Sequence, residues 1–178
     1  SLGRYNIYTT NNIVSNNNYA GFRLQSESIT MYNNIFKNNV VGGSTGTSGN
    51  NVIENNTFQQ VNGGPVSEIL DASVLPELTF RNNKYYGSSA QSTWFSIGGT
   101  NYDLAGWTTQ TGEIGAQAQQ VSFVDPNRNV ATYMASLGET PTYDGFMNRA
   151  IAMNKYQWDN RFTAPIVNDY IRAGFATI

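Results

Sequence analysis

The sequence predicts a mainly β fold, a solenoid of coils about 22 residues long, followed by a small α-helical tail. Three observations predict it. Paired asparagines recur at 11–12, 33–34, 55–56 and 82–83, so the pairs are 22, 22 and 27 residues apart. A bulky apolar residue follows each pair by two positions, namely Val14, Phe36, Phe58 and Tyr85. The repeats also lack the i, i+3, i+4 apolar spacing of helical repeats.

Each repeat is interpreted as a short strand that ends in an asparagine bend. Residues 29–32 and 52–54 are rich in β-branched and apolar side chains, which favour strands. Asparagine tolerates left-handed backbone angles, so the Asn-Asn pair suits the bend. Coils stacked at about 4.8 Å would place the second asparagine of each pair over the next, and the amides would form a hydrogen-bonded ladder. The apolar residues would form a second ladder inside.

Composition excludes several classes of function. The chain has 178 residues, a net charge of -2, no His and no Cys, so thiol and imidazole catalysis, disulfides and Cys/His zinc sites are excluded. The charge gives no reason to expect nucleic acid as a partner, and no apolar run approaches the roughly 18 residues of a membrane span. Its 12 Asp and Glu show no calcium-loop spacing. We therefore expect no metal site and no cofactor.

The repeat resembles a known family. Over residues 5–88 the pattern apolar-x-N-N-x-[VFY] is similar to that of the right-handed parallel β-helix in the pectate-lyase-like superfamily of secreted bacterial proteins. The resemblance implies that fold, an extracellular location and activity on polysaccharides. Lyases of this kind use a Lys or Arg base and often Ca²⁺, and hydrolases use paired carboxylates.

The sequence divides into residues 1–126, the coils and their cap, and residues 127–178, a helical extension. Strands are predicted at 92–97 and 121–124. A short helix is predicted at 103–110, with Asp103 as N-cap and Gly112 as its end. This closing stretch resembles the last segment of secreted bacterial β-helix proteins. Trp107 either fills the last coil or contributes to a sugar-binding surface.

Three helices are predicted in the extension. One has apolar residues from Val130 to Leu137, and a second has them from Phe146 to Ile151. Thr163 would cap the third, with Ile166, Val167, Tyr170 and Ile171 buried. The stretch WDNRFTAPIVNDYIRAGF, residues 158–175, resembles a tail found on bacterial β-helix exoproteins. It is interpreted as packing structure, with docking to the same protein or a partner as the alternative.

The sequence opens inside a repeat, at SLGRYNI. We therefore expect the chain to be the C-terminal part of a longer protein, with most catalytic coils upstream. Its first coil would stack on the N-terminal remainder of the same protein or on another chain.

Three residues are candidates for catalysis. With the repeats in phase, Arg23 aligns through residues 44–47 with Glu68, two coils and about 10 Å away. Asp71 follows three residues later, and only a bulge or turn would bring it to the face of Glu68. A sugar chain could lie across this distance. The alternative is that all three are solvated surface charges, in pairs worth less than about 1 kcal/mol.

Three further residues are candidates for substrate binding. Gln25 shares the outward side of its strand with Arg23, because side chains alternate along a strand. Tyr86 and Trp94 belong to an aromatic-rich stretch, and flat rings suit the faces of sugars. For both aromatic residues, burial in the core is the alternative.

Two functions remain open at this point. The first is part of a secreted carbohydrate-active enzyme, a polysaccharide lyase or glycoside hydrolase. The second is a non-catalytic surface, adhesion or assembly protein that presents a rigid scaffold to glycans or to a protein partner.

Overall fold

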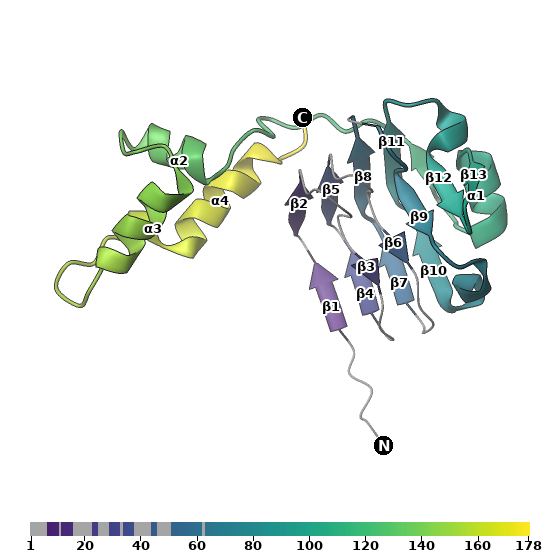
Figure 1. Ribbon diagram of the computed structural model, residues 1–178, viewed down its shortest axis with the longest axis horizontal. Coiled ribbons are helices and arrows are strands. Elements are labelled where there is room, and N and C mark those ends of the chain that lie inside the picture. The colour runs from purple at the N-terminus through teal and green to yellow at the C-terminus, as the bar shows by residue number, and fades with distance from the viewer. Residues whose placement is uncertain are drawn as a thin grey trace, which may run out of the picture. The chain divides into compact units, whose positions relative to one another are not determined.

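The chain forms two compact units, residues 1–121 and 122–178. Figure 1 shows the computed structural model, which describes residues 7–10, 12–15, 23–24, 29–32, 34–37, 44–45, 51–61 and 63–178. Short parallel strands dominate the first unit, and helices make up most of the second.

The described strands of the first unit form three sheets. Each sheet takes every third strand, except at the end of the third sheet, where two consecutive strands pair. The first contains β1 (Ile7–Thr10), β4 (Ile29–Tyr32), β7 (Asn51–Glu54) and β10 (Leu78–Arg81). The second contains β2 (Ile13–Ser15), β5 (Ile35–Lys37), β8 (Thr57–Gln60), β11 (Lys84–Gly87) and β14 (Gln117–Ala118). The third contains β3 (Arg23–Leu24), β6 (Ser44–Thr45), β9 (Ser67–Ile69), β12 (Phe95–Ile97) and β13 (Thr100–Tyr102). All these pairings are parallel except that of β12 with β13.

The pairing register follows the spacing of the asparagine pairs. In the second sheet Val14 pairs with Phe36, Phe36 with Phe58, and Phe58 with Tyr85. These are the residues that follow each Asn-Asn by two positions. The repeat in the sequence therefore sets which residues are neighbours across the sheets.

The predicted fold class is wrong. We expected a mainly β, right-handed parallel β-helix of the pectate-lyase-like kind. Over the residues that the structure describes, the fold is mixed α/β: three short sheets, made of strands of two to four residues, combine with four α-helices and three 3₁₀ segments. The repeat accounts for strand pairing in the first unit. It carries no information about the helices that the later half of the chain contributes.

The predicted amide ladder is present. The side-chain nitrogen of Asn12 donates to Oδ1 of Asn34, that of Asn34 to Asn56, and that of Asn56 to Asn83, each at 3.1 Å. The backbone N–H of each donor residue bonds the same oxygen at 2.9 to 3.0 Å. Asn34, Asn56 and Asn83 are buried. Each oxygen thus accepts two hydrogen bonds, as a buried amide must to offset its loss of water.

The bends take the left-handed conformation that the sequence predicts for them. Asn55 has φ 56° and Asn82 has φ 53°, and both are the first asparagine of their pair. In these two pairs the first asparagine thus makes the turn, while the second enters the ladder. This division of roles explains why the residues occur in pairs.

Replacing Asn82 with Val should lower the free energy of unfolding by about 1–2 kcal/mol, because a β-branched side chain is strained at positive φ. Asn82→Gly should change it far less, since glycine adopts this conformation freely. Urea unfolding followed by circular dichroism measures both variants. Equal losses for Val and Gly would show that the amide, and not the backbone angle, selects asparagine at this position.

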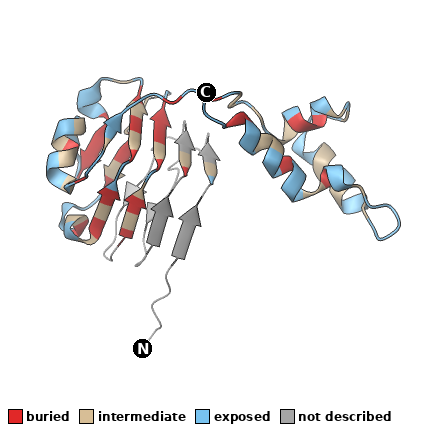
Figure 2. Ribbon diagram, turned by 180° about the vertical axis from the view of Figure 1, so that it is seen from behind, coloured by how far each residue is buried: buried red, intermediate tan, exposed pale blue. Residues whose placement is uncertain are grey.

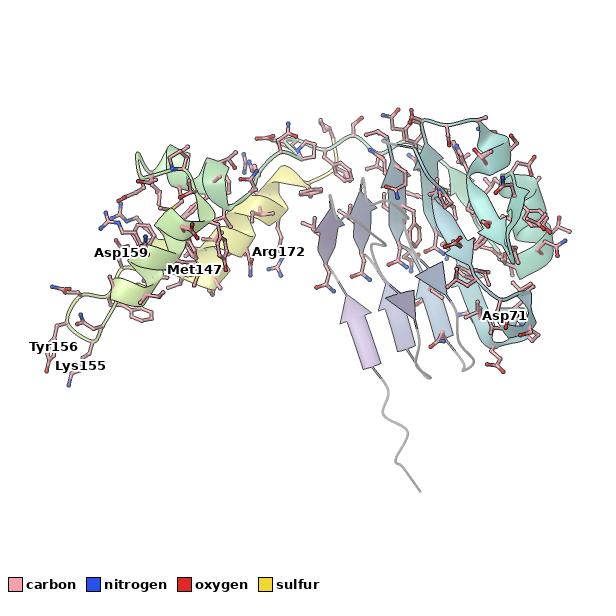
Figure 3. The ribbon with its side chains drawn as sticks, in the orientation of Figure 1. Asp71, Met147, Lys155, Tyr156, Asp159 and Arg172 are labelled. Atoms are coloured by element: carbon pink, nitrogen blue, oxygen red, sulfur yellow. The ribbon has the colours of Figure 1, made fainter. Side chains whose placement is uncertain are left out.

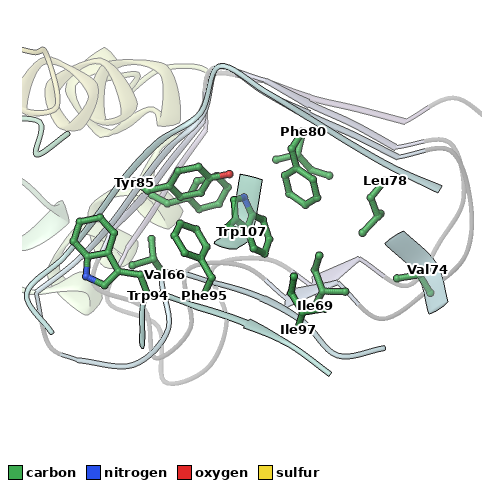
Figure 4. Close-up of a cluster of buried hydrophobic side chains, with 12 residues drawn as sticks. Val66, Ile69, Val74, Leu78, Phe80, Tyr85, Trp94, Phe95, Ile97 and Trp107 are labelled. Atoms are coloured by element: carbon green, nitrogen blue, oxygen red, sulfur yellow. The ribbon is translucent and has the colours of Figure 1, made fainter. Parts of the chain in front are cut away.

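Buried positions line the described strands of the first unit (Figure 2), and aromatic rings fill its core (Figure 4). Phe58 and Tyr85 stack with their centroids 5.2 Å apart, which continues the pairing of their strands. Phe95 and Trp107 stack at 4.7 Å, and Phe95 meets the edge of Tyr85 at 4.9 Å. Trp107 and Tyr85 have no exposed surface. Trp107 is therefore a core residue, one of the two alternatives left open for it.

The segment after the repeats contains helix α1, Leu104–Thr111. As predicted, Asp103 caps its start by accepting from the N–H of Gly106 at 2.7 Å, and Gly112 ends it with φ 68°. The 3₁₀ segments η1 (Ala72–Glu77) and η2 (Gln91–Thr93) lie before it. The strand predicted at 121–124 is wrong, since the pairing falls at β14, where Gln117 lies beside Lys84.

The second unit contains the three predicted helices, α2 (Val130–Ser136), α3 (Tyr143–Ala152) and α4 (Ala164–Gly174), together with η3 (Asn160–Phe162). Its core holds Tyr133, Met134, Phe162 and Val167. Ile166, which we expected to be buried, is 42% exposed, because Val167 takes the inward position on α4.

Candidate functional site

A buried carboxylate ends the amide ladder. Glu113 is 6% exposed, and its Oε1 accepts from the backbone N–H of Asn83 at 3.2 Å and from the Asn83 side chain at 2.8 Å. Its Oε2 accepts from the hydroxyl of Tyr85 at 2.9 Å and from the indole of Trp107 at 2.8 Å. Four donors therefore converge on one carboxyl group.

The direction of the ladder explains why an acidic residue stands here. Every amide donates to the next oxygen along the chain of bonds, so the last amide, Asn83, needs an acceptor beyond it. A carboxylate is the side chain that accepts without having to donate. Glu113 also joins α1 to the sheets through Trp107.

The electrostatic setting of Glu113 opposes its ionisation. Loss of water raises the pKa of the carboxyl group above its ordinary value, although the hydrogen bonds from Trp107, Asn83 and Tyr85 act in the opposite direction. Burial, together with the charge of Glu113, raises the pKa of the Tyr85 hydroxyl well above its ordinary value. These contacts of Glu113 are all internal, so its role is structural.

A row of polar positions crosses the third sheet. Arg23 pairs with Ser44, Ser44 with Glu68, Glu68 with Ser96, and Ser96 with Asn101. For Glu68, Ser96 and Asn101, the members of this row whose side chains are described, the pairing places the side chains on one face of the sheet. Two strand spacings separate Arg23 from Glu68, about 10 Å. The alignment of the repeats thus placed these two residues in the relation that the structure shows.

An open pocket lies at one end of this row. Its volume is about 380 Å³, and the residues that line it are Gly64, Pro65, Glu68, Ser89, Thr93, Ser96 and Asn101. Glu68 is half-buried between two buried residues of β9, so its carboxylate faces away from the core. Hydroxyl, amide and carboxylate groups therefore surround one cavity of ligand size.

The two aromatic candidates are not among the residues that line this pocket. Trp94 is only 3% exposed, and its indole donates to the carbonyl of Ser89 at 3.1 Å. Tyr86 is half-buried, and its ring meets the edge of Trp94 at 6.0 Å. Trp94 thus supports the wall of the pocket through Ser89, and it offers little of its face to a ligand.

The remaining candidates stand apart from the pocket lining. Asp71 caps η1, where its Oδ1 accepts from the N–H of Ser73 at 2.9 Å, and this bond lowers the pKa of the carboxyl group. Gln25 lies outside the described residues. Of Arg23 only the strand position is described. The structure therefore brings Glu68 to the pocket and gives Asp71 a local structural role.

The pocket is suited to binding by hydrogen bonds. Within the described part of the lining, Glu68 supplies the single ionisable group, and the other polar groups are neutral. A search of the described residues finds no cluster of three or more acidic, His or Cys side chains that could hold a metal ion. None of the described helices has the length and apolar character needed to cross a membrane.

The chain matches no protein-family model, and neither a curated protein nor a solved structure matches it. The resemblance to the pectate-lyase-like family gains no support from these comparisons, and the mixed α/β architecture contradicts it. The assignment of the fold to that family is therefore withdrawn, and the function has to follow from the site.

Sequence reasoning missed two parts of the structure. The hydroxyl residues Ser89, Thr93 and Ser96 carry no periodic signal and reach the pocket only through the packing of η2 and β12. Glu113 lies 30 residues beyond Asn83, outside the repeat. One signal could have revealed it, since a ladder of donors with a fixed direction requires an acceptor at its end.

Proposed function

We propose that this chain binds a neutral polysaccharide through the pocket beside Glu68, and that it acts as a binding module in a secreted protein. The observation that supports this is the polar row of the third sheet, which leads from Arg23 into a pocket lined by hydroxyl, amide and carboxylate groups. The sheet holds these positions about 4.8 Å apart, so they form a regular set of contacts for an extended polymer.

Sugar recognition suits the chemistry of this pocket. Polyhydroxylated rings present many donors and acceptors at short spacing, and the hydroxyls of Ser89, Thr93 and Ser96 can serve as either. Asn101 adds an amide that offers both functions. The pocket volume of about 380 Å³ falls in the range of small-molecule sites.

The charge of the pocket favours a neutral glycan. Glu68 is the one ionisable group among the described lining residues, and a carboxylate would repel the acid group of a uronic acid ring. The same carboxylate is a strong acceptor for sugar hydroxyls, since hydrogen bonds to ionised groups are stronger than neutral ones.

Binding accounts for this site better than cleavage does. Glycoside hydrolysis uses two carboxyl groups about 5–9.5 Å apart, one of them as an acid. Glu68 has no carboxylate beside it in the described lining, and Asp71 is committed to the cap of η1. The pocket thus provides contacts that hold a sugar, without the second group that would break it.

Affinity electrophoresis tests this function. The full chain should be retarded in gels that contain neutral polysaccharides such as xylan, mannan or glucan, and less so in polygalacturonate. Glu68→Gln should reduce the retardation by about tenfold in apparent affinity, as loss of a charged hydrogen bond does.

The matched control is Asp144→Asn, which removes the same charge from an exposed residue of α3. Asp144→Asn should migrate as the wild-type chain does in every gel. The proposal would be contradicted if no polysaccharide changed the migration of the wild-type chain. It would also be contradicted if the wild-type chain and Glu68→Gln were retarded equally.

A further inference from the structure

The second unit presents two large aromatic side chains to solvent, on the loop that follows α3. Tyr156 is 86% exposed and Trp158 is 64% exposed. Figure 3 shows Tyr156 and Lys155 on this loop, with Asp159 on the same segment. Exposing two neighbouring rings costs the free energy that their burial would have contributed, so the loop is not explained by packing alone.

Hydrogen bonds hold this loop and orient the indole. The Trp158 indole donates to Oδ1 of Asn160 at 2.5 Å. The N–H of Tyr156 donates to Oδ1 of Asn154 at 2.9 Å. The N–H of Gln157 donates to the backbone carbonyl of Asn154 at 3.1 Å. An exposed ring fixed in this way loses little conformational entropy when a ligand stacks on it.

A second pocket, of about 330 Å³, lies next to the Trp158 ring. Met153 and Phe162 provide apolar surface in its lining, and Arg149, Gln157 and Asp159 provide polar groups. An apolar surface beside planar polar groups is the arrangement that a sugar ring requires, because its face is apolar and its rim carries hydroxyls.

The charges around this pocket are already balanced. Asp159 holds Arg161 in a two-point pair, with Nε–Oδ1 at 3.1 Å and Nη2–Oδ2 at 2.8 Å. Arg149 pairs with Glu139. Each charge therefore has an internal partner, and the site offers hydrogen-bonding groups without a net attraction for an anion or a cation.

From these observations we propose that Trp158, Gln157 and Asp159 form a second glycan site, in which a neutral sugar ring stacks on the indole. This inference rests on the proposed function for its ligand class, and it adds a site on a different unit of the chain. Two sites on one chain raise the affinity for a polymer through effective concentration, while each site alone binds short sugars weakly.

Fluorescence titration of the full chain tests the second site. Trp94 and Trp107 are buried, so Trp158 is the indole that a sugar can reach among the three. Neutral oligosaccharides of xylan, mannan and glucan should shift or quench the emission of the wild-type chain. Trp158→Phe should lose this signal and keep polymer binding, because the smaller ring still stacks.

Trp158→Ala should weaken polymer binding by at least about tenfold, as loss of a central aromatic anchor does. The matched control is Tyr143→Ala, which removes another exposed aromatic ring, 62% exposed, that is not in the pocket lining. Polymer affinity unchanged by Trp158→Ala, or lowered equally by Tyr143→Ala, would overturn the inference.

The double variant Glu68→Gln, Trp158→Ala separates the two proposals. If both sites bind, each single variant weakens retention by the polymer and the double variant abolishes it. If only the Trp158 site binds, Glu68→Gln has no effect and the proposed function of the first pocket fails alone. If only the first pocket binds, Trp158→Ala has no effect and the second-site inference fails alone.

Discussion

Replacing Glu113 with Ala is expected to lower the free energy of unfolding by about 3–5 kcal/mol. The substitution removes the acceptor of four hydrogen bonds, from Asn83, Tyr85 and Trp107, in a place that is 6% exposed. Each buried donor left without a partner costs about 1–3 kcal/mol, and the sum is smaller than four such costs because the site relaxes. Urea unfolding of the full chain, followed by tryptophan fluorescence, measures the loss.

Two further variants serve as comparisons for Glu113→Ala. Glu113→Gln keeps an oxygen for Asn83 but turns a donor toward the Trp107 indole, so it should cost less than Glu113→Ala. Asp169→Ala removes an exposed carboxylate of α4 whose pair with Arg172 spans 3.8 Å, and it should cost under about 1 kcal/mol. A loss for Glu113→Ala no greater than for Asp169→Ala would show that the ladder does not need its acceptor.

The raised pKa of Glu113 also predicts how the free energy of unfolding depends on pH. A carboxyl group whose pKa is higher in the folded state binds its proton more tightly there than in the unfolded chain. Its contribution to stability is therefore fully present below the unfolded pKa, and is lost as pH rises through the folded pKa. Glu113→Gln should remove this part of the pH dependence, which unfolding between pH 4 and 8 measures.

Asn56→Ala is the second change with a large expected effect, a loss of about 2–4 kcal/mol in the free energy of unfolding. Asn56 is fully buried in the middle of the ladder, where its oxygen accepts twice from Asn34 and its amide donates to Asn83. Removing it takes away the oxygen that accepts from the backbone N–H and the side-chain amide of Asn34, and it takes one bond from Asn83.

The control for this change is Asn148→Ala, at an exposed position of α3. Alanine favours helices more than asparagine does, so Asn148→Ala should be neutral or slightly stabilising. Chemical denaturation of both variants under one set of conditions gives the comparison. Similar unfolding free energies for the two variants would mean that the stacked amides contribute nothing beyond filling space.

Strand pairing in the first unit follows from the sequence because the repeat is local and periodic. The 22-residue spacing places Val14, Phe36 and Phe58 in register, and the paired asparagines supply both the bend and the ladder. Cap residues likewise located the helices, as Asp103 does for α1. These features depend on short-range rules that a single sequence displays.

The fold class and half of the site could not be predicted in this way. The mainly β prediction reduced the helices to a small tail on a β-helix, whereas helices and short sheets together make the fold. β14 forms where Gln117 pairs with Lys84, a long-range pairing that lies outside the repeat. Ser96 and Asn101 reach the pocket through β12 and β13, whose antiparallel turn lies outside the repeat.

Titration calorimetry of the wild-type chain and Asn101→Trp, with neutral polysaccharides as the ligands, tests glycan binding at the Glu68 pocket most directly. Asn101 is exposed on β13, a strand position that tolerates tryptophan, and the larger side chain would fill the pocket. We expect the wild-type chain to bind a neutral polysaccharide. We expect Asn101→Trp to lose the part of the binding enthalpy that the Glu68 pocket contributes. Wild-type binding that Asn101→Trp leaves unchanged, or no binding to any neutral polysaccharide, would contradict glycan binding at this pocket.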